Sequence, residues 1–100
     1  MMTDINFGVV NAAALAVLPS LLRRWLPDGK LVGREFEARN PTRADNRRGS
    51  FRINIETGKW SDFAIGDKGG DPVSLAAYIA GTGQVEAAQN LTVMLGVTNV

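Results

Sequence analysis

The residue types that most often carry out chemistry are scarce in this chain. It has 100 residues and contains no histidine and no cysteine, so the common nucleophile–base pairs cannot form and a structural zinc site is essentially excluded. Ser50, Ser61 and Ser74 have no activating partner that the sequence reveals. We therefore expect no catalytic residues and no cofactor, and we predict that the protein is not an enzyme.

Three aspartates lie close enough in sequence to suggest a site for a hard metal ion. Asp62, Asp67 and Asp71 offer the oxygen ligands that Mg²⁺ prefers. Asp71 has a sufficient role of its own, because an aspartate followed by Pro72 is a strong helix start, with the carboxylate as N-cap and the proline in the first turn. Asp67 and Lys68 could simply be turn residues. We favour these structural roles and predict no metal site.

The segment GDKGGD, residues 66–71, precedes this helix start and could be taken for a phosphate-binding loop. It lacks the spacing and the Lys-Ser/Thr ending of a P-loop. Asp71 would also place a negative charge where a phosphate should sit. We favour a tight loop that lets the backbone pass close to the sheet.

Charge is unevenly distributed, although the net charge is only +1. Residues 39–52 carry a local charge of +4, whereas residues 60–100 carry −3. The charged residues of the basic segment are Arg39, Arg43, Asp45, Arg47, Arg48 and Arg52. Such a chain can bind a polyanion, a protein with a basic groove, or both. The alternative is a solvated surface without a partner.

The N-terminal quarter of the chain is predicted to be helical. Its apolar residues recur at spacings of three and four, namely Phe7, Val10, Ala14, Val17, Leu21 and Trp25. Pro19 interrupts this stripe, so either one helix kinks there or a second short helix begins with Pro19 in its first turn. The longest apolar run, residues 12–22, is too short and too broken to span a bilayer, and no basic leader precedes it.

Two β-hairpins are predicted next. In the first, Glu35 and Glu37 alternate with apolar residues, which places both glutamates on the outer face of the sheet. The second hairpin turns at Gly58, which suits a left-handed backbone position. Its last strand, residues 59–63, is predicted to put Phe63 in the core and Trp60 on the opposite face.

Two helices are predicted to follow the second hairpin. Their buried residues are expected to be Leu75, Ala76, Ile79, Ala80, Val85, Ala88, Leu91 and Leu95. Gly81 and Gly83 are expected to end the first helix and Gly96 the second, and Thr82 is expected to cap the second. The fold class is thus α+β: an N-terminal helix or kinked helix pair, a small antiparallel sheet of two hairpins, and two C-terminal helices packed on one face. Residues 1–100 are expected to form a single domain.

Residues 21–97 resemble the N-terminal zinc-ribbon-like domain of phage and plasmid DNA primases. The motifs occur in the same order: "NP" before a basic loop, "SF" opening a strand, an aromatic-Ser-Asp-Phe strand, and "GDKGGD" leading into an apolar helix. The resemblance implies metal-ligand positions near Asn40, Arg43, Asp62 and Ile65, none of which is Cys or His. We therefore expect a ribbon without metal, in which Ile65 packs into the old site and Asn40 and Asp62 hydrogen-bond across it.

The same resemblance implies that the domain engages single-stranded template. The basic residues Arg43, Arg47, Arg48 and Arg52 would suit that role, with Trp60 as a stacking surface. No acidic motif for nucleotide transfer is present in the sequence to Val100, which argues against an enzyme.

The whole chain also resembles the small phage-encoded anti-CRISPR proteins that inhibit type I-F surveillance complexes. That resemblance implies a monomer in the host bacterial cytoplasm, with no membrane partner. It would block DNA entry at the large subunit and the adjacent backbone subunit, with guide RNA or the DNA backbone as a further contact. Carboxylates placed like phosphates would suit a basic DNA channel. The candidate contact residues are Glu35, Glu37, Arg43, Asp45, Arg47, Arg48, Trp60, Asp67 and Lys68.

Overall fold

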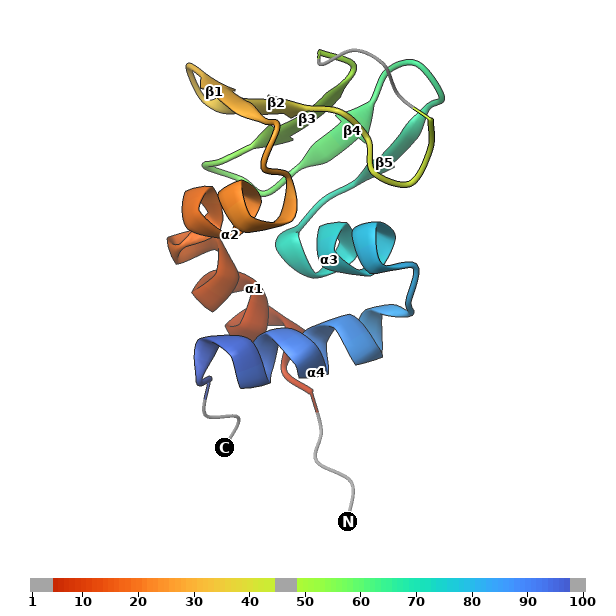
Figure 1. Cartoon of the computed structure of the whole chain (residues 1–100). Coiled ribbons are helices and arrows are strands. Elements are labelled where there is room, and N and C mark those ends of the chain that lie inside the picture. The colour runs from red at the N-terminus through yellow and green to blue at the C-terminus, as the bar shows by residue number, and fades with distance from the viewer. Residues whose placement is uncertain (1–4, 45–48, 98–100) are drawn as a thin grey trace.

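The computed structural model describes residues 5–44 and 49–97. A sheet lies at one end of the molecule, and all four helices lie on one side of it (Figure 1). Helices α2 (Leu18–Trp25) and α3 (Pro72–Ala80) pack directly against the sheet, and α1 (Phe7–Ala16) and α4 (Gln84–Leu95) form a further layer beneath them. This arrangement confirms the predicted α+β class with helices on one face. The opposite face of the sheet, here called the outer face, is not covered by any helix in the described ranges.

The N-terminal helices are separate elements. Helix α1 spans Phe7–Ala16 and is capped by Asn6, whose side chain accepts a hydrogen bond from the Val9 amide. Helix α2 spans Leu18–Trp25 with Pro19 in its first turn, where the missing amide hydrogen costs no helical bond. The two axes are bent by 82°. Of the two predicted alternatives, the second short helix is therefore correct.

Within the described residues, no single helix is long and apolar enough to cross a membrane. Only the bent pair α1 and α2, taken together, reaches the length and composition that a span would need.

The sheet is an antiparallel meander in the order β1-β2-β3-β4-β5. Its strands are β1 Lys30–Val32, β2 Glu35–Ala38, β3 Phe51–Asn54, β4 Trp60–Asp62 and β5 Asp67–Gly69. Gly33 and Gly58 turn the two predicted hairpins with φ of 62° and 80°. Strand β5 was not predicted, since the sequence was expected to form a loop there. A residue set of Asp, Lys and Gly has poor strand propensity, and only pairing with β4 makes it a strand.

The predicted orientation of β4 is wrong. Trp60 pairs with Ile53 and Asp62 with Phe51, so Trp60 and Asp62 both point toward the helices. Phe63, the next residue along the chain, therefore points to the outer face and is 66% exposed. The aspartate can take the inward position because partners from distant parts of the chain satisfy it, and the phenylalanine is left outside.

The C-terminal helices are α3 Pro72–Ala80 and α4 Gln84–Leu95. Asp71 caps α3 as predicted, in a capping box with Ser74: the Asp71 carboxylate accepts from the Ser74 amide at 2.8 Å. Gly81 and Gly96 end the helices in left-handed conformations, also as predicted.

Three details of these helices differ from the prediction. Gly83, not Thr82, occupies the N-cap of α4. Ala80 and Val85 are exposed. Ala80 is the last residue of α3 and Val85 lies in the first turn of α4, so both flank the turn between these helices.

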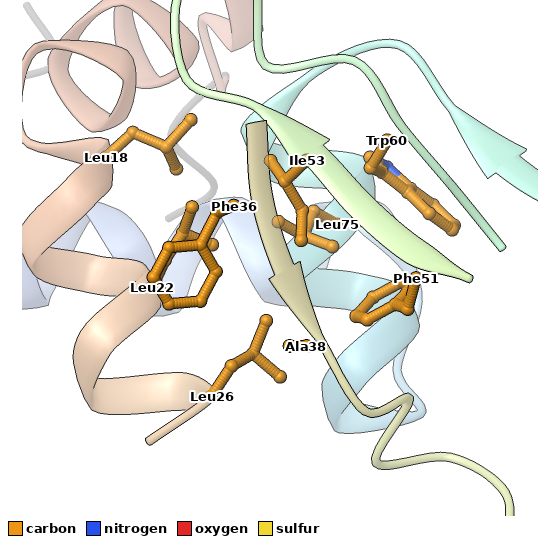
Figure 2. Packing of buried hydrophobic residues seen from close by; sticks show 9 residues of the cluster. All are labelled: Leu18, Leu22, Leu26, Phe36, Ala38, Phe51, Ile53, Trp60 and Leu75. Atoms are coloured by element: carbon orange, nitrogen blue, oxygen red, sulfur yellow. The ribbon is translucent and has the colours of Figure 1, made fainter. Parts of the chain in front are cut away.

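The inner core joins α2 and α3 to the sheet (Figure 2). Its buried members are Leu18, Leu22, Leu26, Phe36, Ala38, Phe51, Ile53, Trp60 and Leu75. Trp60 packs at 6.2 Å from Phe51, ring centre to ring centre, and its indole N–H donates to Ser74 Oγ at 3.0 Å. A buried tryptophan needs such an acceptor, so this bond also fixes the sheet against α3.

Candidate functional site

A buried polar cluster links the end of β2 to the end of β4. Asp62 is 0% exposed and Asn40 is 1% exposed. The side-chain amide of Asn40 donates to Asp62 Oδ2 at 2.9 Å, and the Arg43 guanidinium donates to both carboxylate oxygens, at 2.9 and 3.3 Å. The Ala64 amide donates to Oδ1 at 3.0 Å. We call Asn40, Arg43, Asp62 and Tyr78 the Asp62 cluster.

The electrostatics of the cluster keep Asp62 ionised. Burial by itself raises the pKa of this carboxyl, but the hydrogen bonds from Arg43, Asn40 and the Ala64 amide outweigh it. The net result lowers the pKa of Asp62 from 3.8 to about 2. A carboxylate that stays charged at neutral pH is poorly suited to proton transfer. Asp62 therefore acts as a structural anion.

The two segments that meet here have the same turn geometry. The Thr42 amide donates to Asn40 Oδ1 at 2.9 Å, just as the Ala64 amide donates to Asp62 Oδ1. In each turn, the backbone amide three residues on also donates a hydrogen bond to the backbone carbonyl of the first residue. Arg43 N–H donates to Asn40 at 3.4 Å, and Ile65 N–H donates to Asp62 at 3.3 Å. Asn and Asp side chains favour such turns because they bond the backbone two residues on.

These turns coincide with the positions where the primase resemblance implies metal ligands. The expected hydrogen bond between Asn40 and Asp62 is confirmed. The expected packing of Ile65 is wrong, since Ile65 is 48% exposed. Arg43, at another of these positions, donates hydrogen bonds to the Asp62 carboxylate and neutralises its charge. Among the described residues, no group of three or more His, Cys, Asp or Glu side chains is placed to hold a metal ion.

Tyr78 of α3 extends the cluster to strand β5. Its hydroxyl donates to Asp67 Oδ2 at 2.6 Å and accepts from the Asn40 amide at 2.8 Å. Asp67 pairs with Asp62 in the sheet, so its side chain points toward the helices. Asp67 is thus engaged internally, and it is a poor candidate for a partner contact.

The outer face carries a row of side chains in register across all five strands. Lys30 pairs with Glu37, Glu37 with Arg52, Arg52 with Ser61, and Ser61 with Lys68. Because alternate residues share a face, all five lie on the outer side. The row is rich in charge and has three cations.

A shallow hollow lies on this face over strands β3 to β5. Residues that line it include Glu35, Arg52, Lys59, Ser61, Phe63 and Lys68. The Phe63 ring lies under the Arg52 guanidinium, 5.4 Å from its centre. Arg52 also approaches Glu37 at 3.5 Å and Glu35 at 3.9 Å. The hollow therefore combines one exposed aromatic ring with cations and carboxylates.

The predicted site residues fall into three groups. Glu35, Glu37 and Lys68 share the outer face, and the predicted outward placement of both glutamates is confirmed. Arg43, Trp60 and Asp67 belong to the interior: Arg43 is bound to Asp62, Asp67 to Tyr78, and Trp60 is only 6% exposed. The prediction that Trp60 is a surface anchor or stacking surface is therefore wrong. Asp45, Arg47 and Arg48 lie outside the described residues.

Sequence reasoning missed Phe63 and Lys59 as surface residues. The signal was the spacing of Lys59, Ser61 and Phe63, which alternate along one face of a strand. That spacing becomes informative only when Asp62 is recognised as buried.

No protein-family model matches this chain, and no curated protein matches it significantly.

Proposed function

We propose that this protein binds single-stranded nucleic acid on the outer face of its sheet. One observation carries the proposal: exposed Phe63 lies beside Arg52 on a face that also presents Lys59 and Lys68. Single-strand binders combine a basic groove that follows the backbone with aromatic rings on which bases stack. The role is the one that the primase resemblance implies, with Phe63 in place of Trp60.

An unpaired base suits this face better than a duplex does. The Phe63 ring is exposed to solvent. A base can stack on the ring only when the face of the base is not already stacked or paired within a duplex. Each such stack contributes about 1–3 kcal/mol. Lys59 and Lys68, both exposed, lie on the same face and would contact phosphates of the bound strand.

The internal placement of two carboxylates and one indole ring weighs against interpreting the face as a phosphate mimic. Asp62 and Asp67 are held inside by Arg43 and Tyr78. Trp60, which an inhibitor would need as an apolar anchor, is buried. Nucleic-acid binding needs none of these groups on the surface.

A second candidate function is inhibition of a type I-F CRISPR surveillance complex. It is favoured by Glu35 and Glu37, whose side chains are 40% and 24% exposed on the outer face and could meet the basic surface of a DNA channel. Binding would occur at the large subunit and the adjacent backbone subunit, where target DNA enters. Either function would place the protein in the bacterial host cytoplasm.

A gel-shift experiment distinguishes the two functions. Labelled single-stranded DNA is titrated with the protein alone, and labelled target duplex is presented to the surveillance complex with and without the protein. We expect the single strand to shift in a salt-sensitive way while the target shift is unchanged. If the protein leaves single strands unshifted but abolishes the target shift, the inhibitor function is correct and the first proposal is wrong.

A further inference from the structure

Arg52 is held on several sides at the centre of the outer face. Its Nε donates to the Gly49 carbonyl at 2.7 Å, and its two terminal nitrogens face Glu35 and Glu37. The guanidinium carbon lies over the Phe63 ring, 5.4 Å from the ring centre. Together the two groups form a stacking platform with a defined position.

The stacking platform has no net positive charge, whereas Lys59 and Lys68 in the same hollow are cationic. Two carboxylates beside one guanidinium leave the centre without net positive charge, so Arg52 is a weak site for a phosphate. Lys59 and Lys68 lie on the same face and retain exposed ammonium groups. A single strand would thus place its phosphates at the lysines and a base over Phe63 and Arg52.

The two glutamates differ in their relation to the hollow. Glu35 lines it together with Phe63, and its carboxylate is the more distant partner of Arg52, at 3.9 Å. Glu37 lies closer to Arg52, at 3.5 Å, and is less exposed. Glu37 therefore positions Arg52, and Glu35 is the acceptor that a bound base meets.

Given the proposed function, on which this inference rests, we propose that Glu35 selects guanine among the bases that stack on Phe63. An ionised carboxylate only accepts hydrogen bonds. Guanine carries two adjacent donors, N1–H and the 2-amino group, which match its two oxygens, whereas thymine flanks its single N–H donor with two carbonyls. Charge-assisted bonds with two parallel contacts are both stronger and more selective than single ones.

The test measures binding of labelled 12-mers by fluorescence anisotropy. Four oligonucleotides are compared: all thymine, and the same strand with one central guanine, cytosine or hypoxanthine. Hypoxanthine is guanine without the 2-amino group. For the native protein we expect the guanine strand to bind at least about fivefold tighter than the thymine strand, the lower end of what a paired base contact supplies. The hypoxanthine strand should lose most of this preference.

Two variants isolate the carboxylate. Glu35→Gln should bind the guanine and thymine strands equally, although its overall affinity rises with the loss of a negative charge. Glu56→Gln changes the charge by the same amount. Glu56 lies in the β3–β4 turn, pairs with Arg34 of the β1–β2 turn, and does not line the hollow. This variant should keep the guanine preference. Because both glutamates are partly exposed, neither change should alter the circular dichroism spectrum.

The outcomes separate this inference from the proposed function. Equal binding of all four strands by the native protein overturns guanine selection and leaves single-strand binding intact. A guanine preference that persists in Glu35→Gln also overturns it. If no strand binds, single-strand binding itself is wrong, and guanine selection with it.

Discussion

The side chains of Asn40 and Asp62, 22 positions apart in the chain, meet in a 2.9 Å hydrogen bond inside the protein. Each residue also starts a turn by accepting a backbone amide two residues on. The pair therefore fixes two loops to each other and aligns them with Tyr78 of α3.

Loss of the Asp62 carboxylate should destabilise the fold strongly. Asp62→Ala removes one acceptor of the buried Asn40 side-chain amide, which also donates to the Tyr78 hydroxyl, and it removes the counter-ion of the Arg43 guanidinium. Breaking a buried pair in this way typically costs about 3–5 kcal/mol. We expect thermal unfolding, followed by circular dichroism, to shift downward by more than about 10 °C. Glu56→Ala, on the surface, is the control and should unfold near the native temperature; an unchanged midpoint for Asp62→Ala would contradict the role of the cluster.

Stability should fall in acid because of the same residue. The folded-state pKa of Asp62 is about 2, below its ordinary value of 3.8, so the folded protein binds this proton less readily than the unfolded chain. Its contribution, on the order of 2 kcal/mol, is complete above pH about 4 and disappears as the pH falls through about 2. Urea unfolding between pH 5 and 2.5 should show a smaller loss of stability for Asp62→Asn than for the native protein. Parallel curves for the two proteins would exclude Asp62 as the source.

A methyl group at position 69 should disturb the core. The Cβ of an alanine there would lie 2.4 Å from Trp60 Nε1 and 2.6 Å from Ser74 Oγ, so the indole would have to move. Overpacking of this kind costs about 1–3 kcal/mol. Gly70→Ala is the matched control, because its Cβ would meet nothing within 4 Å. Chemical denaturation should separate the two variants, and equal midpoints would show that the Trp60 site is more yielding than its geometry implies.

Removal of the Phe63 ring should weaken binding without weakening the fold. The side chain is 66% exposed, so Phe63→Ala should change stability by less than about 0.5 kcal/mol. Loss of one stacked base should lower the affinity for single-stranded DNA by about 1–3 kcal/mol. Val85→Ala removes exposed apolar surface from α4, away from the sheet, and should bind as the native protein does. Anisotropy titrations that place both variants at native affinity would remove Phe63 from the site.

The salt dependence of binding should report the number of phosphate contacts. Lys68→Ala removes one cation from the outer face and should reduce the slope of log K against log salt by about 0.7, the value for one contact with a single strand. Arg24→Ala removes an exposed cation from α2, on the helical side of the sheet, and serves as the control. A slope that Lys68→Ala leaves unchanged would place the phosphates elsewhere.

Local chemistry in the sequence was sufficient to predict many of the turns and caps. Asp71 and Pro72 mark the start of α3, and Gly33 and Gly58 mark the hairpins, because each position has a backbone requirement that those residue types meet. The outward placement of Glu35 and Glu37 followed from simple alternation. Such features depend on neighbours only a few residues away.

Long-range contacts decided the rest. Whether Asp62 or Phe63 points inward depends on Asn40, Arg43 and Tyr78, which reach the same place from two other segments, the loop after β2 and helix α3. Strand β5 exists because β4 offers it an edge. Trp60 lies inside because Gly69 leaves room and Ser74 supplies an acceptor.

The α+β class, the C-terminal ends of α3 and α4 and the lack of histidine and cysteine chemistry follow from the sequence, because periodicity, capping and composition are local properties. Which face of β4 is buried, and hence which aromatic ring meets solvent, depends on contacts between distant segments. The physical reason is that a charged side chain can be buried only where distant residues neutralise it and satisfy its hydrogen bonds. At Asp62 they do, and Phe63 is exposed as a consequence.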